Sequence, residues 1–280
     1  EQLLAAARNN GVPELELLAR RQVASLEPDV RAAAAIYSGT SGVIDQMELM
    51  RSLATAAQAS GALIAYKHTV ERIERDGDRF LLGVSDPEGG ATRLTASVLV
   101  NSAGLAADAI AAMLGYDLDG GDSTPRLRQV PRLRQVINKG RYYDIVGSQQ
   151  AARIRHLVYP LPNPDRSGLG VHVTLDIDGG AHIGPDTEWL DGAAPLDYRA
   201  DDSRRQQFLE SAQSYLPWLT SDDIAPGQVG YRGKLSGPGE PPADFLVWHD
   251  RGYVHLGGIE SPGMTASLAI ARLVQSQIEG

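Results

Sequence analysis

The sequence contains no cysteine, which excludes disulfides, thiolate metal sites and cysteine nucleophiles. Basic residues are outnumbered, with 26 Lys and Arg against 35 Asp and Glu. The resulting net charge of −9 argues against nucleic acid or an anionic membrane surface as the main partner. Long hydrophobic runs are also missing, because none approaches the ~18 residues that a transmembrane helix needs. The sequence therefore predicts no transmembrane segment.

Several catalytic motifs are absent as well. Ser261 lacks the G-x-S-x-G spacing of a hydrolase nucleophile, since Ile259 stands where the first glycine belongs. No two histidines are four positions apart, as a zincin site requires, and no metal site is predicted. The chain also has no P-loop. These absences leave the glycine-rich turns as the features to explain.

The chain has 280 residues, of which 42% are hydrophobic. This is enough for one large domain or for two interleaved domains. It begins in a helical pattern, with neither an initiator Met nor a signal peptide. We therefore expect the chain to continue a longer sequence.

A strand–turn–helix pattern lies near the C-terminus. Residues 254–256 are an apolar strand, and the glycines and proline of residues 257–263 interrupt regular structure. Residues 264–278 follow with helical periodicity. This geometry points backbone N–H groups and a helix N-terminus at the turn, where an anionic or electron-rich ligand would fit. An ordinary strand-to-helix connection remains the alternative.

A second unit of this kind lies earlier in the chain. Residues 98–100 read as a strand buried on both faces, residues 101–104 as a turn, and residues 106–114 as a helix. We predict that both strands lie in one mainly parallel sheet. Ala103 and Gly104 would then share a crevice with Pro262 and Gly263 at the carboxyl ends of the strands.

The remaining elements follow from periodicity and turn signals. Helices are predicted at residues 1–10, 14–20 and 202–215, and after Asp45, where Met47 and Met50 belong to the buried side. Strands are predicted at residues 62–66, 69–74, 80–84, 94–100, 137–146, 157–160, 168–175, 182–184, 227–235 and 245–248. Residues 171–176 alternate, so His172 lies opposite the core face, toward solvent or toward a cavity.

Residues 125–130 and 131–136 are a direct repeat, P-R-L-R-Q-V. One copy suffices to lead into the strand at residue 137. Because proline cannot sit inside a central strand, the other copy must bulge out or extend an edge. A tolerated surface insertion explains the repeat more simply than a basic binding patch.

The two turns carry a family resemblance. Residues 100–105 and 258–267 resemble the D-amino-acid-oxidase superfamily of FAD-dependent oxidoreductases, and within it the L-2-hydroxyglutarate dehydrogenase/oxidase branch. Further segments agree in order and spacing, namely residues 41–45, 139–143, 159–162, 170–174, 178–179 and 184–185. One departure is plain: the G-x-G-x-x-G turn that holds the FAD pyrophosphate is absent. The mid-helix start favours a fragment over genuine loss of that site.

The resemblance implies an α/β (α+β) fold. A Rossmann-like FAD-binding domain, here without its first βαβ unit, would be interleaved with an antiparallel-sheet substrate domain. Residues 1–136 with 251–280 would form the FAD-binding domain with a helical insertion, and residues 137–250 the substrate domain. FAD would be contacted by residues of the two turns and by one residue upstream: Val70, Ala103, Gly104, Gly258, Ser261, Pro262, Gly263, Met264 and Thr265.

The resemblance also suggests catalytic residues. Arg232 follows a glycine and an apolar residue in a late strand, as does an arginine of related oxidoreductases. Its guanidinium could hold a substrate carboxylate by two parallel hydrogen bonds; a surface Arg paired with a carboxylate is the alternative. His172 is the candidate on the cavity face. Tyr143 and Tyr159 are secondary candidates as hydrogen-bond donors, or equally wall packing.

The function implied is oxidation of a small 2-hydroxy acid, such as L-2-hydroxyglutarate, to the 2-oxo acid, with hydride transfer to flavin N5. One alternative is an amine oxidase of the same superfamily, acting on glycine or sarcosine. Another is a flavin-free remnant that acts as a binding module. The expected location is the cytoplasm, with peripheral contact with the inner membrane left open. The electron acceptor stays open too.

Overall fold

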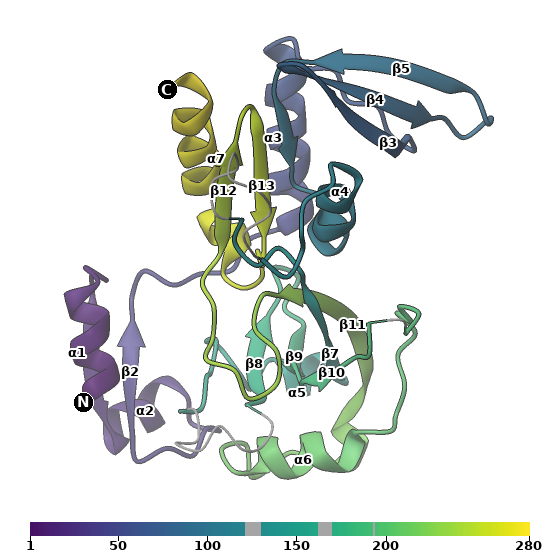
Figure 1. The fold of residues 1–280 in the computed structure, drawn as a ribbon. Coiled ribbons are helices and arrows are strands. Elements are labelled where there is room, and N and C mark those ends of the chain that lie inside the picture. Colours follow the sequence, from purple (N-terminus) through teal and green to yellow (C-terminus); the bar gives the residue numbers. More distant parts are fainter. Residues whose placement is uncertain (121–129, 162–169, 193) are drawn as a thin grey trace. The chain divides into compact units, whose positions relative to one another are not determined.

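The computed structural model describes residues 1–120, 130–161, 170–192 and 194–280. The chain folds into two compact units (Figure 1). Unit 1 contains residues 1–62, 140–187 and 197–230, and unit 2 contains residues 63–139, 188–196 and 231–280. Two of the unit boundaries fall within long strands, β7 Val136–Ile145 and β11 Ile224–Lys234, so each strand supplies residues to both units.

Unit 1 is built around an antiparallel sheet. Strand β7 pairs with β9, β9 pairs with β8, and β11 also pairs with β7. The elements of this unit, besides β7 and β11, are α1 Gln2–Asn9, β1 Leu15–Ala19, α2 Arg20–Leu26, β2 Ala34–Ser38, α3 Gln46–Ala59, α5 Ser148–Ala151, β8 His172–Leu175, β9 Ala181–Gly184, α6 Arg205–Gln213 and the 3₁₀ turn η2 Ser221–Asp223.

The core of unit 1 follows from the two-residue period of its strands. Val171 and Val173 are fully buried, and Ile183 of β9 joins them. Helix α6 contributes Phe208 and Ala212 from one side. His172 lies on the other face of β8 and is partly exposed. The predicted alternation around His172 is therefore confirmed.

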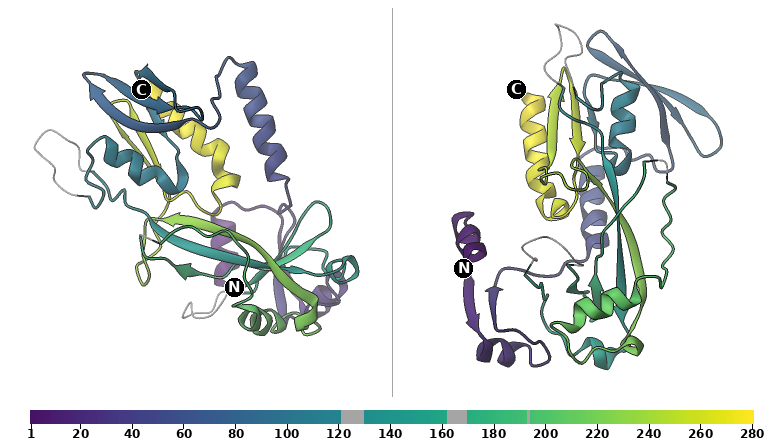
Figure 2. Two further views of the ribbon diagram at one scale, coloured as in Figure 1. Left: turned by 90° about the vertical axis from the view of Figure 1, so that its right-hand side faces the viewer. Right: turned by 60° about the horizontal axis from the view of Figure 1, so that its bottom comes forward.

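Unit 2 contains two three-stranded sheets. Strands β3 Thr69–Asp76, β4 Arg79–Ser85 and β5 Ala91–Ala96 form an antiparallel sheet, and β12, β13 and β6 form the second, in that order. The other elements of this unit are β6 Leu99–Asn101, η1 Gly104–Ala106, α4 Ala107–Met113, β10 Glu188–Trp189, β12 Leu246–Asp250, β13 Tyr253–Gly257 and α7 Gly263–Glu279. Helices α7 and α4 lie on opposite sides of the second sheet (Figure 1, Figure 2).

The second sheet joins the two strand–turn–helix units as predicted, but it is not mainly parallel, because β12 and β13 are antiparallel. Strands β6 and β13 are parallel, with Leu99 opposite Tyr253 and Asn101 opposite His255. Their carboxyl ends therefore lie together, and each leads into its own turn. The predicted α/β (α+β) class is confirmed. The loss of a first βαβ unit stays a prediction.

Several sequence predictions were wrong. The helix predicted at residues 14–20 is replaced by strand β1 over residues 15–19, because pairing with β2 from Leu15–Ser38 to Ala19–Ala34 satisfies the backbone. The apolar side of α3 is exposed, with Met47 at 53% and Met50 at 54%, although Asp45 caps the helix as predicted. Residues 62–66 form no strand.

The predicted strands at 94–100 and 157–160 also differ. The first is divided between β5 and β6. Val98 and Val100 are 36% and 40% exposed rather than buried on both faces, and Val100 faces a cavity. The second is reduced to a bridge between Val158 and Val173. The predicted strand at 168–175 starts outside the described residues, and β8 forms its last part.

The second copy of the repeat is part of the core of unit 2. Leu133 is fully buried beside Val130 and Phe80. The N–H groups of Leu133 and Arg134 both donate to the carbonyl of Leu118 at 2.8 Å. This copy is therefore no loose insertion. Residues 125–129 of the first copy lie outside the described residues.

The sequence analysis predicted an FAD-binding domain at residues 1–136 with 251–280 and a substrate domain at residues 137–250. This assignment of roles stays a prediction. By packing, residues 1–62 belong with part of the predicted substrate domain. Among the described residues, the helices are too short or too polar for any of them to be a membrane span.

Candidate functional site

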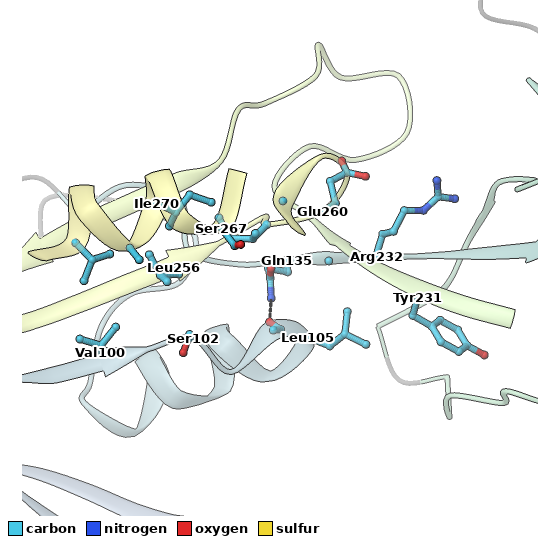
Figure 3. Close-up of a pocket in the computed structure, with 16 residues that line it drawn as sticks. Val100, Ser102, Leu105, Gln135, Tyr231, Arg232, Leu256, Glu260, Ser267 and Ile270 are labelled. Carbon is cyan, nitrogen blue, oxygen red and sulfur yellow. Dashed lines mark hydrogen bonds between the residues drawn. The ribbon is translucent and has the colours of Figure 1, made fainter. Parts of the chain in front are cut away.

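A cavity of about 550 Å³ opens in unit 2 at the carboxyl ends of β6 and β13 (Figure 3). Of the four residues that the sequence predicted to share a crevice, Gly104 of the first turn and Gly263 of the second line this cavity. The apolar lining side chains come from β6, η1, β13, the second turn and α7: Val100, Leu105, Leu256, Ile259, Ile270, Ala271 and Val274. The polar lining side chains are Ser102, Gln135, Tyr231, Arg232, Glu260 and Ser267.

Glycine is required at two positions of the second turn. Gly258 has φ +65°, and a Cβ there would lie 2.8 Å from the Cγ of Leu235. A Cβ on Gly263 would lie 2.6 Å from Cγ2 of Ile259. Both distances are shorter than any real Cβ contact, so larger residues would push the turn out of place.

The N-terminus of α7 lies at this turn. Ser261 and Pro262 precede the helix, Gly263 begins it, and the N–H of Ala266 makes a backbone bond to Pro262 at 3.0 Å. The N–H groups of Met264 and Thr265 belong to the first turn, which has no intrahelical acceptors. This end of a 17-residue helix is electropositive and favours electron-rich groups.

Gln135 connects the two turns, and the sequence analysis missed it. Its side-chain Nε2 donates to the carbonyl of Gly104 at 2.8 Å (Figure 3). The N–H of Gly258 donates to its Oε1 at 2.9 Å. No signal in the sequence marks Gln135 except its place at the end of the second repeat copy.

Charged residues lie on one part of the cavity wall. Arg232 and Tyr231 line the cavity and leave β11 in opposite directions (Figure 3). The Nη2 of Arg232 donates to Oδ1 of the fully buried Asn138 at 2.6 Å. The ammonium of Lys234 pairs with the carboxylate of Glu260, which also lines the cavity. Arg232 and Lys234 are therefore the two cationic side chains of β11 at this wall.

Asn101, Tyr253 and His255 form a buried polar cluster in β6 and β13, the strands that lead into the two turns. Asn101 Nδ2 donates to the Tyr253 hydroxyl at 2.8 Å and to the carbonyl of Ala107 at 2.7 Å. The Nδ1 of His255 lies 3.0 Å from that hydroxyl. Burial lowers the pKa of His255 to about 4, despite the nearby charge of Asp108. His255 is therefore neutral at physiological pH.

Ala103 and Val70 are two further residues that the sequence predicted to contact the cofactor. The N–H of Ala103 donates to Oδ1 of Asn101 at 3.2 Å, which fixes the start of the first turn. Val70 is in β3 and packs against the core of unit 2. Their contact with a cofactor stays a prediction.

The three other predicted catalytic residues lie in unit 1. His172 and Tyr159 stack with ring centroids 4.0 Å apart and an interplanar angle of 13°, and burial raises the pKa of Tyr159. Tyr143 is fully buried against Phe208. Its hydroxyl donates to the carbonyl of Asp201 at 3.5 Å, and burial raises its pKa to about 12. The structure brings His172 and Tyr159 together and places Tyr143 in the core.

The cavity fits the ring end of a flavin. Its volume lies within the ~300–1,000 Å³ typical of small-molecule sites. Apolar side chains suit a flat aromatic ring, and the open space beside Gly104, where a Cβ would meet no atom within 4 Å, allows the ring to approach the backbone. The electropositive end of α7 suits the electron-rich edge of the ring.

Comparison with known sequences agrees with this fit. A sequence model of the family described as "FAD dependent oxidoreductase" matches residues 1–277. The mitochondrial L-2-hydroxyglutarate dehydrogenase of Arabidopsis thaliana is 32% identical over 313 residues, covering 98% of this chain and 62% of that protein. The L-2-hydroxyglutarate dehydrogenase of Escherichia coli strain K12 is 23% identical, covering 96% of this chain and 67% of that protein. The chain thus spans about two thirds of the length of these relatives, or slightly less.

Solved structures show the same fold. The dithionite-reduced L-alpha-glycerophosphate oxidase of Mycoplasma pneumoniae with FAD bound has a TM-score of 0.75 at 20% identity, covering 100% of this chain and 70% of that chain. The glycine oxidase of Bacillus cereus ATCC 14579 has a TM-score of 0.69 at 18% identity, covering 100% of this chain and 68% of that chain. At these identities the similarity concerns the fold alone.

Proposed function

The chain belongs to the family of FAD-dependent oxidoreductases, and from this premise we propose that it acts in the oxidation of a small 2-hydroxy acid to the 2-oxo acid. The preferred substrate is L-2-hydroxyglutarate, the compound named in the relatives from Arabidopsis thaliana and Escherichia coli. The observation that carries the proposal is the position of Arg232 on the wall of a glycine-lined cavity.

Arg232 binds the α-carboxylate of the substrate in this proposal. A guanidinium donates two parallel hydrogen bonds to a carboxylate and so fixes its orientation as well as its position. The bond from Nη2 to Asn138 holds the guanidinium plane, because Asn138 is buried and cannot move freely. The α-carbon would then have one defined direction relative to the cavity.

Residues of both turns would hold FAD, which supplies a two-electron acceptor for the hydride on the substrate α-carbon. Gly104 allows close approach to the backbone, and Gly258 is a proposed contact in the second turn. Ser261, Pro262 and Gly263 shape the second turn, while the N–H groups of Met264 and Thr265 point from the end of α7. Ala103 and Val70 are proposed contacts on the first turn and on β3.

Oxidation of the alcohol also releases the hydroxyl proton, and a base must accept it. His172 and Tyr159, whose rings stack on one another in unit 1, stay predicted catalytic residues. A direct role of Tyr143 stays a prediction, since its hydroxyl is engaged in the core.

The test is steady-state dye reduction by the protein with FAD, comparing L-2-hydroxyglutarate, L-lactate, glycine and sarcosine. We expect L-2-hydroxyglutarate to give the highest kcat/KM. Faster turnover of glycine or sarcosine would instead identify an amine oxidase. A colourless protein that binds no FAD would identify a binding module.

Two further properties are proposals that the same preparation can test. We propose a cytoplasmic location, and cell fractionation would show whether the protein also sediments with the inner membrane. The electron acceptor is identified by measuring turnover with oxygen or with a quinone in place of the dye.

A further inference from the structure

The two turns of the cavity are distant in sequence, one at residues 101–104 and the other at residues 257–263. The parallel ladder between β6 and β13 ends at the pair Asn101–His255. Beyond this pair the first turn bends toward α4, while the second continues through Gly257 to Gly258. The gap between Gly104 and Gly258 therefore depends on what lies between them.

The side-chain amide of Gln135 lies between them. It donates from Nε2 to the carbonyl of Gly104 and accepts at Oε1 from the N–H of Gly258, at 2.8 and 2.9 Å. The backbone N–H of Gln135 donates to Oδ2 of Asp108 in α4 at 3.3 Å, which anchors the residue at its own main chain. One residue thus contacts both turns and the helix that follows the first turn.

Both halves of the amide are needed at this place. A carbonyl on one side requires a donor, and an N–H on the other side requires an acceptor, and the Gln135 amide presents both on two neighbouring atoms. The neighbouring strand leaves room for the amide, because a Cβ on Gly233 would lie 2.7 Å from Oε1 and 2.9 Å from Cδ of Gln135. The site is therefore shaped around this side chain.

We propose that Gln135 is the positioning residue that sets the spacing of the two flavin-facing turns. It also lines the cavity, but its main effect acts through Gly104 and Gly258. The inference rests on the proposed function for its cofactor, whereas the bridge itself is a property of the chain. Loss of the bridge lets the second turn move away from the first, so the cavity loses its shape for the ring.

The experiment compares Gln135→Ala and Gln135→Glu with Gln213→Ala in the full protein. Gln213 is a matched control in unit 1, because its Nε2 donates to the carbonyl of Leu219 at 2.8 Å. Hydrogen exchange at Gly258 is measured before FAD is added. We expect exchange about tenfold faster in Gln135→Ala, the scale of one lost hydrogen bond, and unchanged in Gln213→Ala. Gln135→Glu keeps the acceptor and should keep Gly258 protected.

The second readout is FAD itself. We expect the Kd for FAD to rise about tenfold in Gln135→Ala, and the visible spectrum of the bound flavin to shift in both Gln135 variants at saturation. Gln213→Ala should change neither, even where its Tm falls equally.

Two results would overturn the inference. Equal hydrogen exchange at Gly258 in Gln135→Ala and in the wild type would show that Gln135 does not bridge the two turns. An unchanged Kd for FAD together with an unchanged flavin spectrum would show that Gln135 does not position the turns for the flavin. A wild type that binds no FAD while Gln135 still protects Gly258 would overturn the proposed function and leave the bridge in place. If Gln135→Ala does not fold, the flavin spectrum of Gln135→Glu tests the inference. A shifted spectrum supports it and an unchanged spectrum contradicts it.

Discussion

Acid should destabilise unit 2 through His255, the buried histidine beneath the second turn. Its ring is fully buried, and its Nδ1 lies 3.2 Å from Asn101 Nδ2 and 3.0 Å from the Tyr253 hydroxyl. Within the described residues, Nε2 is buried without a hydrogen-bond partner. Protonation would place a new donor at the Asn101 amide or a charge in apolar surroundings, and both are unfavourable.

The magnitude follows from the pKa. Burial lowers the pKa of His255 in the folded state from 6.5 to about 4. Between these values the unfolded chain binds the proton and the folded chain does not, so the free energy of unfolding falls as the pH falls. The loss begins below about pH 6.5, levels off near pH 4 and totals roughly 3 kcal/mol.

The assay is urea unfolding of the wild type and of His255→Gln at a series of pH values from about 7.5 to 4.5. Glutamine does not titrate, so the difference between the two proteins removes the contribution of the carboxylates. We expect this difference to change by about 2.5 kcal/mol over the series, with the wild type losing stability. Parallel curves would refute the reasoning, as would an NMR titration of His255 with an ordinary pKa.

Three other predictions concern the site and the core. Arg232→Lys keeps the charge but loses the two-pronged donor. The value of kcat/KM for the 2-hydroxy acid should therefore fall, by an amount that corresponds to a loss of about 1–3 kcal/mol in transition-state stabilisation. Unchanged kinetics would show that Arg232 does not bind the carboxylate. Gly263→Ala should cost about 1–3 kcal/mol in urea unfolding, because its Cβ meets Ile259. Ile259→Ala should restore part of that loss, and a lack of coupling would show that the contact is unimportant. Leu133→Ala should cost about 2–5 kcal/mol, whereas Leu94→Ala, at a 51% exposed position, should cost far less. Equal losses would place Leu133 outside the core.

The sequence could predict the parts of the site that depend on local chemistry. Glycine and proline mark the turn after β13, and helical periodicity marks α7, because each of these signals acts within a few residues. The parallel pairing of β6 with β13 was predicted because two similar strand–turn–helix units are best placed side by side.

Elements whose structure depends on distant partners were harder to predict. Residues 14–20 have helix-forming composition, yet β2 pairs with them and makes β1. Local propensity is weak compared with a ladder of backbone hydrogen bonds. Similarly, the periodicity of α3 predicted a buried side, but periodicity cannot say what lies opposite, and Met47 and Met50 are exposed.

The repeat shows most directly why sequence alone is insufficient. Gln129 and Gln135 occupy the same position in identical hexapeptides, so no local pattern distinguishes them. Gln135 gains its place from the strand that follows it, because β7 begins at Val136 and holds the residue beside both turns. Its side chain acts through an acceptor at Gly104 and a donor at Gly258, neither of which is near it in sequence. A residue of this kind is identified only once the strands are paired, and the pairing of β6 with β13 brings those two groups within reach of one amide.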